Sequence, residues 1–406
     1  MGSNFNLNIK PVKKDEDEID DTIDDELADE AEIRRSNNAA RSKSFKLLGG
    51  IMVVGIILIA ILWIVSMLMP KSYEYEDIEA ILKKAAIAYF KDYPDQLPQS
   101  EGAGVEIDHT NLVAAEKMKD LSKYLKEGVS CSAVVQVQKS GDDYLYTPYL
   151  NCGEEYTTME LYKAIINQGT VSQGQYGLYS MNGEYVYRGE NVNNYVQLDE
   201  GLWRVVKVSN KNNVVLVKDE EAGNGFPYDD RYNQDLEWKA GINSFSASRI
   251  KDDIEKMYQN PNKDLNEVFL SKNDKKRLVL FNLCTGKRSK SDTSNDNSLE
   301  CKTTEANTKV GLLTASDYMR ASVDTNCTST VSKSCYNYNY LKTKDDYWLV
   351  TGDSQSTSEV FIVNESGFIE SVFASTYANI RPVVYLNERT MYKSGKGTKE
   401  KPFKLK

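Results

Sequence analysis

The clearest feature of the hydrophobic pattern is an uncharged run of 23 residues at 47–69, LLGGIMVVGIILIAILWIVSMLM. A helix needs roughly 20 apolar residues to cross the core of a lipid bilayer. A hydrophilic tail of 46 residues precedes the run, and Met69-Pro70 ends it without a small-residue cleavage site. The pattern therefore favours a retained transmembrane helix over 47–69 rather than a removed signal peptide.

A short stretch of mixed helix and strand patterns follows the run. Apolar residues recur at helical spacing over 75–93 until Pro94, and a second helix is predicted over 111–125. Apolar and polar residues alternate over 132–138 and 144–149, around Ser140-Gly141-Asp142, which is typical of a β-hairpin. We expect a small α+β domain over 70–157.

The remaining residues, 158–406, are rich in strand patterns. Helices are predicted over 159–167 and 246–258, and Asn182-Gly183 predicts a tight hairpin turn. Strands are predicted over 176–180, 184–188, 195–198, 202–208, 214–218, 347–350, 359–363, 368–371 and 380–386. The expected fold class is α+β, with a transmembrane helix, a small α+β domain and a larger domain of antiparallel sheets and long loops.

Charge predicts how the chain is oriented. Residues 1–46 contain an acidic run at 15–32 and almost no aromatic side chains, so this tail is expected to be disordered. The five charges nearest the apolar run on its N-terminal side are all basic, whereas acids follow it on the other side. The positive-inside rule then places the tail in the cytoplasm and the bulk of the chain outside the plasma membrane, with the bilayer as a partner.

The cysteines support that orientation because all six follow the apolar run. An even number confined to one side indicates disulfides in an oxidising exterior. They fall along the chain as three close couples, so we predict the pairs Cys131 with Cys152, Cys284 with Cys301, and Cys327 with Cys335. The alternative is a metal site, but the chain has no CxxC motif and a single histidine.

The larger domain contains a set of distinctive motifs. They are YRGENVNNYV followed by GLWRVVKV (187–208), VGLLTASDY (310–318), YWLVTG (347–352), ANIRPVVYL (378–386) and GKGTKEKPFKL (395–405). Together they resemble a domain that is common in membrane-anchored surface proteins of gut Firmicutes. The W-R-V opening and the R-P-V-V close are similar to the group of C-type lectins and formylglycine-generating enzymes. The resemblance implies small twisted sheets, flanking helices and long irregular loops; function does not follow from it.

The smaller domain combines a predicted helix directly after the apolar run, the KDYPDQLP segment and the cysteine-flanked hairpin. In these features it resembles the pilin-like modules that often accompany the larger domain. The chain departs from a prepilin because Gly49-Gly50 leads into IMVVGIIL without the expected glutamate.

The composition argues against most catalytic and cofactor chemistry. His109 is the only histidine, so a histidine-based triad would have to be built from this residue alone, and a zinc site with several histidines is excluded. Phosphate-loop, dinucleotide-binding and calcium-lectin motifs are absent, and we expect no cofactor and no metal. Paired acids such as Asp229-Asp230 are interpreted as solvated rather than as acid/base pairs. A net charge of -10 disfavours nucleic-acid binding.

The aromatic residues offer one candidate binding surface. Tyr336, Tyr338 and Tyr340 alternate in YNYNY, so a strand there would place three rings on one face. Such a face is either a ligand platform or a packing surface. The tryptophans Trp203, Trp238 and Trp348 are assigned to the core.

Three functional hypotheses follow. The leading one is a non-enzymatic bacterial surface protein whose lectin-like domain binds an extracellular glycan or protein, for recognition or adhesion. The second is a structural or assembly subunit of a pilus-like or secretion complex in the envelope. The third is an enzyme with a carboxylate or Ser-Lys site, which would show acids converging in a pocket.

Overall fold

The computed structural model describes residues 55–60, 73–199, 201–259 and 270–406, apart from the side chains of 223 and 224. The chain divides into two units, Met1–Tyr73 and Glu74–Lys406, and nearly all the described residues belong to the second. The tail predicted to be disordered, 1–46, lies outside the described residues.

The structure corrects the predicted fold class in one respect, the transmembrane helix. Most of the predicted span, 47–69, lies outside the described residues, and its described part, 55–60, is helical. Among the residues that the structure describes, no helix is both long enough and apolar enough to cross a bilayer. The longest of these helices, α2 (Tyr75–Asp92), has 18 residues but carries charged side chains from end to end. The α+β part of the predicted class is confirmed.

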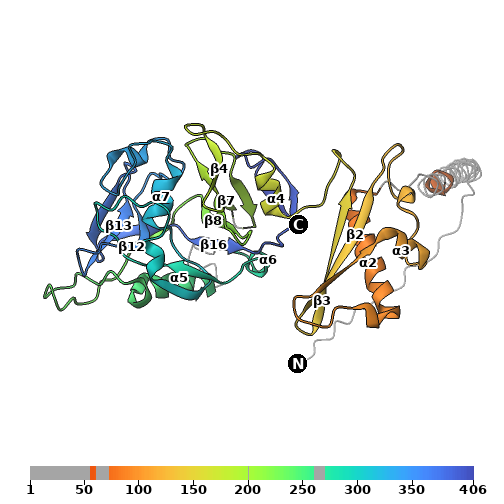
Figure 1. Ribbon diagram of the computed structural model, residues 1–406, viewed down its shortest axis with the longest axis horizontal. Coiled ribbons are helices and arrows are strands. Elements are labelled where there is room, and N and C mark those ends of the chain that lie inside the picture. The colour runs from red at the N-terminus through yellow and green to blue at the C-terminus, as the bar shows by residue number, and fades with distance from the viewer. Residues whose placement is uncertain (1–54, 61–72, 200, 260–269) are drawn as a thin grey trace, which may run out of the picture. The chain divides into compact units, whose positions relative to one another are not determined.

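The first module, defined here as residues 74–157, packs α2 on a three-stranded antiparallel sheet (Figure 1). Ile78, Leu82 and Phe90 share one face of α2 and are almost completely buried, as the spacing of apolar residues predicts. The backbone N–H of Glu74 donates to Asp77 Oδ2 at 3.1 Å and so begins the helix. The strands are β1 (Gly104–Asp108), β2 (Ser132–Ser140) and β3 (Asp143–Asn151).

The predicted hairpin of this module is confirmed, and the predicted second helix is largely wrong. Strands β2 and β3 pair in register from Ser132 with Asn151 to Ser140 with Asp143. In place of a helix over 111–125 the chain forms only α3 (His109–Ala114) and a 3₁₀ turn, η2 (Leu121–Lys123). Between them Glu116 has a φ of 55°, a left-handed conformation that ends a helix.

The head, defined here as residues 158–406, contains two larger sheets. The strand order in the first is β16-β8-β7-β6-β18-β17, with the β4–β5 hairpin attached to β7. Its strands are β4 (Gly177–Met181), β5 (Glu184–Arg188), β6 (Tyr195–Leu198), β7 (Gly201–Val208), β8 (Val214–Lys218), β16 (Val383–Leu386), β17 (Tyr392–Ser394) and β18 (Phe403–Leu405).

The second sheet of the head has the order β14-β13-β12-β15-β9. Its strands are β9 (Ala222–Pro227), β12 (Tyr347–Gly352), β13 (Glu359–Val363), β14 (Ile369–Phe373) and β15 (Tyr377–Ile380). A separate ribbon joins β10 (Phe281–Cys284) and β11 (Thr304–Thr308). The predicted strand at 380–386 is interrupted by Arg381-Pro382, so that its two ends belong to different sheets.

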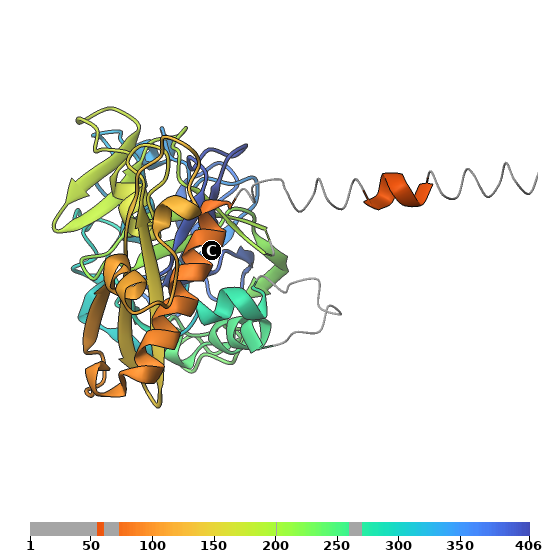
Figure 2. The ribbon, with the colours of Figure 1, turned by 90° about the vertical axis from the view of Figure 1, so that its right-hand side faces the viewer.

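Helices fill the space beside the sheets of the head. They are α4 (Leu161–Ile166), α5 (Arg249–Gln259), α6 (Lys272–Lys276) and α7 (Ala315–Ala321). Helix α7 contacts β5 of the first sheet and β12 of the second, and in Figure 1 it lies between the two sheets. Figure 2 shows α2 of the first module, in orange, beside the strands on which it packs. Trp203 and Trp348 are fully buried in the core, as predicted, but Trp238 is 43% exposed, so its assignment to the core is wrong.

All three predicted disulfides are confirmed. Cys131 pairs with Cys152, Cys284 with Cys301, and Cys327 with Cys335. The first closes the β2–β3 hairpin, and the other two close long polar segments of the head. The described part of the chain contains no free cysteine.

Candidate functional site

The head contains a pocket of about 550 Å³ between α4, the β4–β5 hairpin and the C-terminal strands β17 and β18. In Figure 1 these elements lie together near the end marked C. The pocket is lined by Met159, Ala164, Asn167, Gln168, Gly169, Val171, Tyr176, Gly177, Leu178, Tyr187, Asn191, Val192, Asn193, Tyr392, Gly395, Lys396 and Phe403. Its size is within the range of small-molecule sites.

Two of the motifs on which the resemblance rests meet at this pocket. YRGENVNNYV supplies Tyr187, Asn191 and Asn193, and GKGTKEKPFKL supplies Lys396 and Phe403. The motifs are brought together because β18 pairs in parallel with β6, with Phe403 opposite Val196. Residues that lie about 200 positions apart in the sequence therefore share one wall.

Gln168 joins three sides of the pocket. It follows the last turn of α4, a helix whose Leu161 and Ile165 are buried in the core. Its side-chain oxygen accepts a hydrogen bond from the Tyr187 hydroxyl at 2.7 Å, and its amide donates to the carbonyl of Lys396 at 2.9 Å. The walls formed by α4, β5 and the C-terminal turn are thus held in one arrangement.

Two glycines allow the C-terminal turn to lie against the pocket. Gly395 and Gly397 have φ values of 107° and 73°, and a Cβ atom at Gly397 would lie 2.3 Å from the carbonyl oxygen of Asn193. Only glycine fits such a conformation and such a close approach. The backbone N–H of Lys396 donates to the Lys401 carbonyl at 2.8 Å and closes the turn.

The lining is polar but nearly uncharged. It contains four amide side chains and no Asp or Glu, and Lys396 is the only charged residue among the described lining residues. No hydrogen bond from another described residue occupies the side-chain amides of Asn191 and Asn193. Burial raises the pKa of Tyr187, so its phenol stays protonated and donates a hydrogen bond. The site offers paired donors and acceptors beside apolar and aromatic surface.

The three tyrosines of the predicted platform lie in different surroundings. Tyr340 is buried beneath Arg204, and the Tyr336 ring packs on the edge of Phe368 with centroids 5.0 Å apart. Tyr338 is exposed and lies 5.8 Å, centroid to centroid, from Tyr176 at the pocket. The structure therefore does not bring the three rings onto one face, because the segment forms a 3₁₀ turn, η5 (Lys333–Tyr336), and no strand. Only Tyr338 approaches the site.

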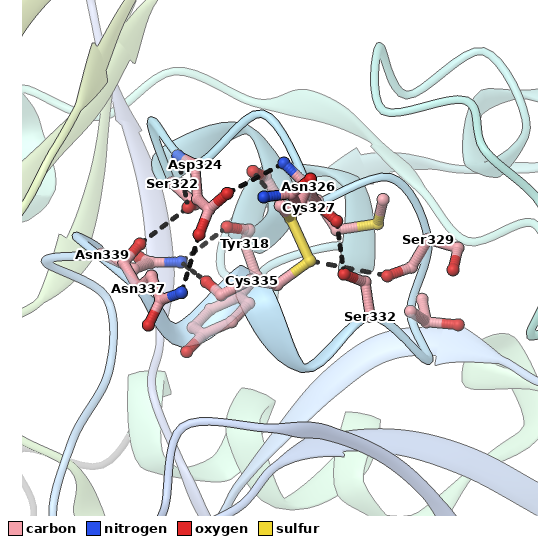
Figure 3. The surroundings of a disulfide bond; sticks show 12 residues. Tyr318, Ser322, Asp324, Asn326, Cys327, Ser329, Ser332, Cys335, Asn337 and Asn339 are labelled. Carbon is pink, nitrogen blue, oxygen red and sulfur yellow. Dashed lines mark hydrogen bonds between the residues drawn. A yellow bond between two sulfur atoms is a disulfide. The ribbon is translucent and has the colours of Figure 1, made fainter. Parts of the chain in front are cut away.

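The loop that carries these tyrosines is held by the disulfide between Cys327 and Cys335 (Figure 3). Asn339 donates to the carbonyls of Tyr318 and Cys335, both at 2.9 Å. Asp324 accepts a hydrogen bond from Asn337 at 2.7 Å. This network fixes the loop on α7 and so holds Tyr338 near Tyr176.

The remaining sequence candidates lie away from the pocket. His109 is in the first module, with Nδ1 3.1 Å from the Ala133 carbonyl oxygen. Asp229 was interpreted as solvated, which is wrong: it is fully buried, pairs with Arg231 and accepts a hydrogen bond from the N–H of Ile242. Among the residues that the structure describes, no cluster of His, Cys, Asp and Glu is placed to hold a metal ion.

The structure also shows buried ion pairs that the sequence did not reveal. Arg288 and Glu300 are fully buried and joined at 3.1 Å, beside the disulfide of Cys284 and Cys301. Glu184 lies 2.9 Å from Lys207 Nζ and 3.0 Å from Arg320. Arg288 and Glu300 also both bond to Ser316 of α7, and Glu184 links β5 to β7 and to α7. We therefore interpret these pairs as structural. Abundant acids and bases in the sequence carried no signal that would have distinguished them.

Comparisons with protein-family models, with curated proteins and with solved structures found no match to this chain. The resemblance of the head to lectin-like domains and of the first module to pilins therefore stays a prediction. The site itself has to carry the functional argument.

Proposed function

We propose that this protein binds a saccharide outside the cytoplasm, in the pocket between α4 and the C-terminal strands, without chemical turnover. The observation that carries the proposal is the lining of that pocket. Unoccupied amides at Asn191 and Asn193 lie beside tyrosine rings, and the described lining residues include no acid. Amide groups both donate and accept, which matches the hydroxyl groups of a sugar.

The disulfides support the proposed location. Disulfides persist in oxidising compartments and are rare in reducing ones. All six cysteines are paired, and one pair holds the loop beside the pocket. This is the basis for proposing that the head of a bacterial surface protein meets its ligand outside the cell.

Titration calorimetry with the purified full-length protein tests the proposal. The ligands are the methyl glycosides of glucose, galactose and N-acetylglucosamine and of their carboxylate-bearing counterparts. We expect binding of at least one, and a loss of about tenfold or more in affinity when Asn191 and Asn193 are both replaced by Ala, because each hydrogen bond contributes about 1 kcal/mol. Asn210→Ala, an exposed turn residue outside the pocket, is the control. No binding by the parent protein, or equal affinity in the double variant, contradicts the proposal.

A second candidate, an assembly subunit of an envelope complex, is favoured by β3. This nine-residue strand is at the edge of its sheet, and Leu145 on it is 40% exposed. An unpaired edge can add a strand from another chain. Crosslinking in intact cells separates the candidates: a stable partner captured through a photoreactive residue at position 145 favours assembly, and its absence disfavours it.

A further inference from the structure

We infer that the ligand of the pocket carries a carboxylate group, which pairs with Lys396. The inference rests on the proposed function, because it names the class of saccharide that the same site takes: an acidic sugar rather than a neutral one. Its basis is the distribution of charge and hydrogen-bonding groups around that lysine.

Lys396 stands alone as a charge at the pocket. The other described lining residues are uncharged. Two of the other lysines in this segment are paired with acids: Lys406 Nζ lies 2.6 Å from Glu79 Oε1, and Lys393 Nζ lies 4.0 Å from Glu76 Oε1. The remaining lysines, Lys399, Lys401 and Lys404, have no such partner among the described residues, but they do not line the pocket. Among the described residues, no acid lies within ion-pair distance of Lys396. A cation left unpaired at the edge of a polar pocket is a natural partner for an anionic ligand.

The backbone of Lys396 is fixed in place. Gly395 and Gly397 on either side adopt left-handed conformations, and both are packed too closely for a Cβ atom. The N–H of Lys396 is bonded to Lys401 and its carbonyl to Gln168, which itself contacts Tyr187. These contacts set the position of the Lys396 backbone on the wall of the pocket.

The net positive charge of the C-terminal segment also favours the binding of an anion. Residues 391–406 contain six lysines and one glutamate, in a chain with a net charge of -10. A local basic segment attracts anions even where the whole protein is acidic.

The single lysine distinguishes a carboxylate from a phosphate. Phosphate sites in proteins usually present several donors, such as an arginine fork or successive backbone N–H groups. Here one ammonium group is accompanied by the neutral amides of Asn191 and Asn193, which suits one carboxylate and the hydroxyl groups beside it.

The experiment compares matched ligand pairs by calorimetry on the full-length protein: methyl glucuronide with methyl glucoside, methyl galacturonide with methyl galactoside, and N-acetylmuramate with N-acetylglucosamine. We expect at least one acidic member to bind about tenfold more tightly than its neutral partner, because a hydrogen bond to a charged group contributes more than a neutral one. Lys396→Gln is expected to remove this preference. Lys399→Gln, an exposed lysine of the same turn that does not line the pocket, is expected to retain it.

The outcomes separate the inference from the proposed function. Equal affinity for acidic and neutral members, with binding still weakened by the Asn191 and Asn193 substitutions, overturns the inference and leaves saccharide binding in place. A preference for acids that survives in Lys396→Gln overturns the role of this lysine. If no member of any pair binds the parent protein, both the proposed function and the inference fall.

Discussion

At the scale of single residues, the pocket depends on side chains and glycines whose roles appear only in three dimensions. Gln168 uses its oxygen and its amide to join Tyr187 to Lys396. Gly397 lets the C-terminal turn approach the Asn193 carbonyl. Neither residue is distinctive in the sequence, since glutamine and glycine serve many purposes.

Gly397→Ala tests this close approach. The new Cβ would clash with Asn193, and the left-handed backbone would be strained, so we expect the free energy of unfolding to fall by about 3 kcal/mol. Gly174 is the matched control: its φ is 85°, but nothing lies within 4 Å of its Cβ position. Gly174→Ala should cost about 1 kcal/mol. Equal losses in urea denaturation would show that the turn is not tightly packed.

The lowered pKa of Asp317 predicts how the stability of the protein depends on pH. Burial alone would raise its pKa, but the charge of Lys207 and hydrogen bonds from Asn297 and Thr314 outweigh burial and lower it. A carboxyl whose pKa is lower in the folded state stabilises the fold above its unfolded pKa, and this contribution is lost as pH falls through the folded value. The free energy of unfolding should therefore decrease below about pH 4.

Substitution of Asp317 checks that assignment. Asp317→Asn should destabilise the protein at pH 7 by about 3 kcal/mol, because it leaves Lys207 and Arg320 less well compensated. It should also flatten the decrease in stability at acidic pH. The exposed Asp345→Asn variant should follow the parent curve. An Asp317→Asn variant with the parent's acid dependence would assign that dependence to other groups.

At the scale of elements, local pattern predicted much of the fold. The helix α2, the β2–β3 and β4–β5 hairpins and the strands β6, β7 and β8 match the expected segments because their apolar spacing and turn residues agree. The helix predicted over 111–125 does not form as one helix, because the backbone of Glu116 adopts a left-handed conformation. The segment around Tyr336 does not form a strand, because the disulfide between Cys327 and Cys335 holds it in a tight loop.

Removal of the disulfide between Cys327 and Cys335 should destabilise the head. Cys327→Ser with Cys335→Ser should lower the free energy of unfolding by about 2.5 kcal/mol, because a short loop is no longer closed in the unfolded state. The same variant should become sensitive to limited proteolysis between Ser322 and Asn339. Only hydrogen bonds then hold this loop, such as those from Asn337 to Asp324 and from Asn339 to the Tyr318 carbonyl. Cleavage at the parent rate would show that the hydrogen bonds suffice to hold the loop.

At the scale of the whole molecule, the pocket could not have been predicted from the sequence. Its lining residues come from three segments, at 159–178, 187–193 and 392–403, that only tertiary structure brings together. The quoted motifs contained some of those residues, but nothing in them indicated that they meet. Trp238 was wrongly assigned to the core for a related reason, because burial depends on what covers a residue and not only on its type.

The C-terminal residue ties the head to the first module. Lys406 Nζ donates to both oxygens of the buried Glu79, at 2.6 and 2.7 Å, and to the Tyr156 hydroxyl at 2.6 Å. Lys406→Met leaves that carboxylate without its cation and should cost about 2 kcal/mol. We expect unfolding followed by tryptophan fluorescence to separate from unfolding followed by helical circular dichroism. Three of the four tryptophans lie in the head and none lies in the first module, which contributes the 18-residue helix α2 to the dichroism. Lys404→Met is the control, and coincident transitions in Lys406→Met would contradict this coupling.

The most direct test of the central claim is an electron-density map of crystals soaked with the tightest-binding acidic glycoside. We predict density for the glycoside in the pocket between Gln168 and the C-terminal turn. Its carboxylate should lie beside Lys396, and its hydroxyl groups should lie beside Asn191 and Asn193. Density at another surface of the head, or an empty pocket at a saturating concentration, would contradict it.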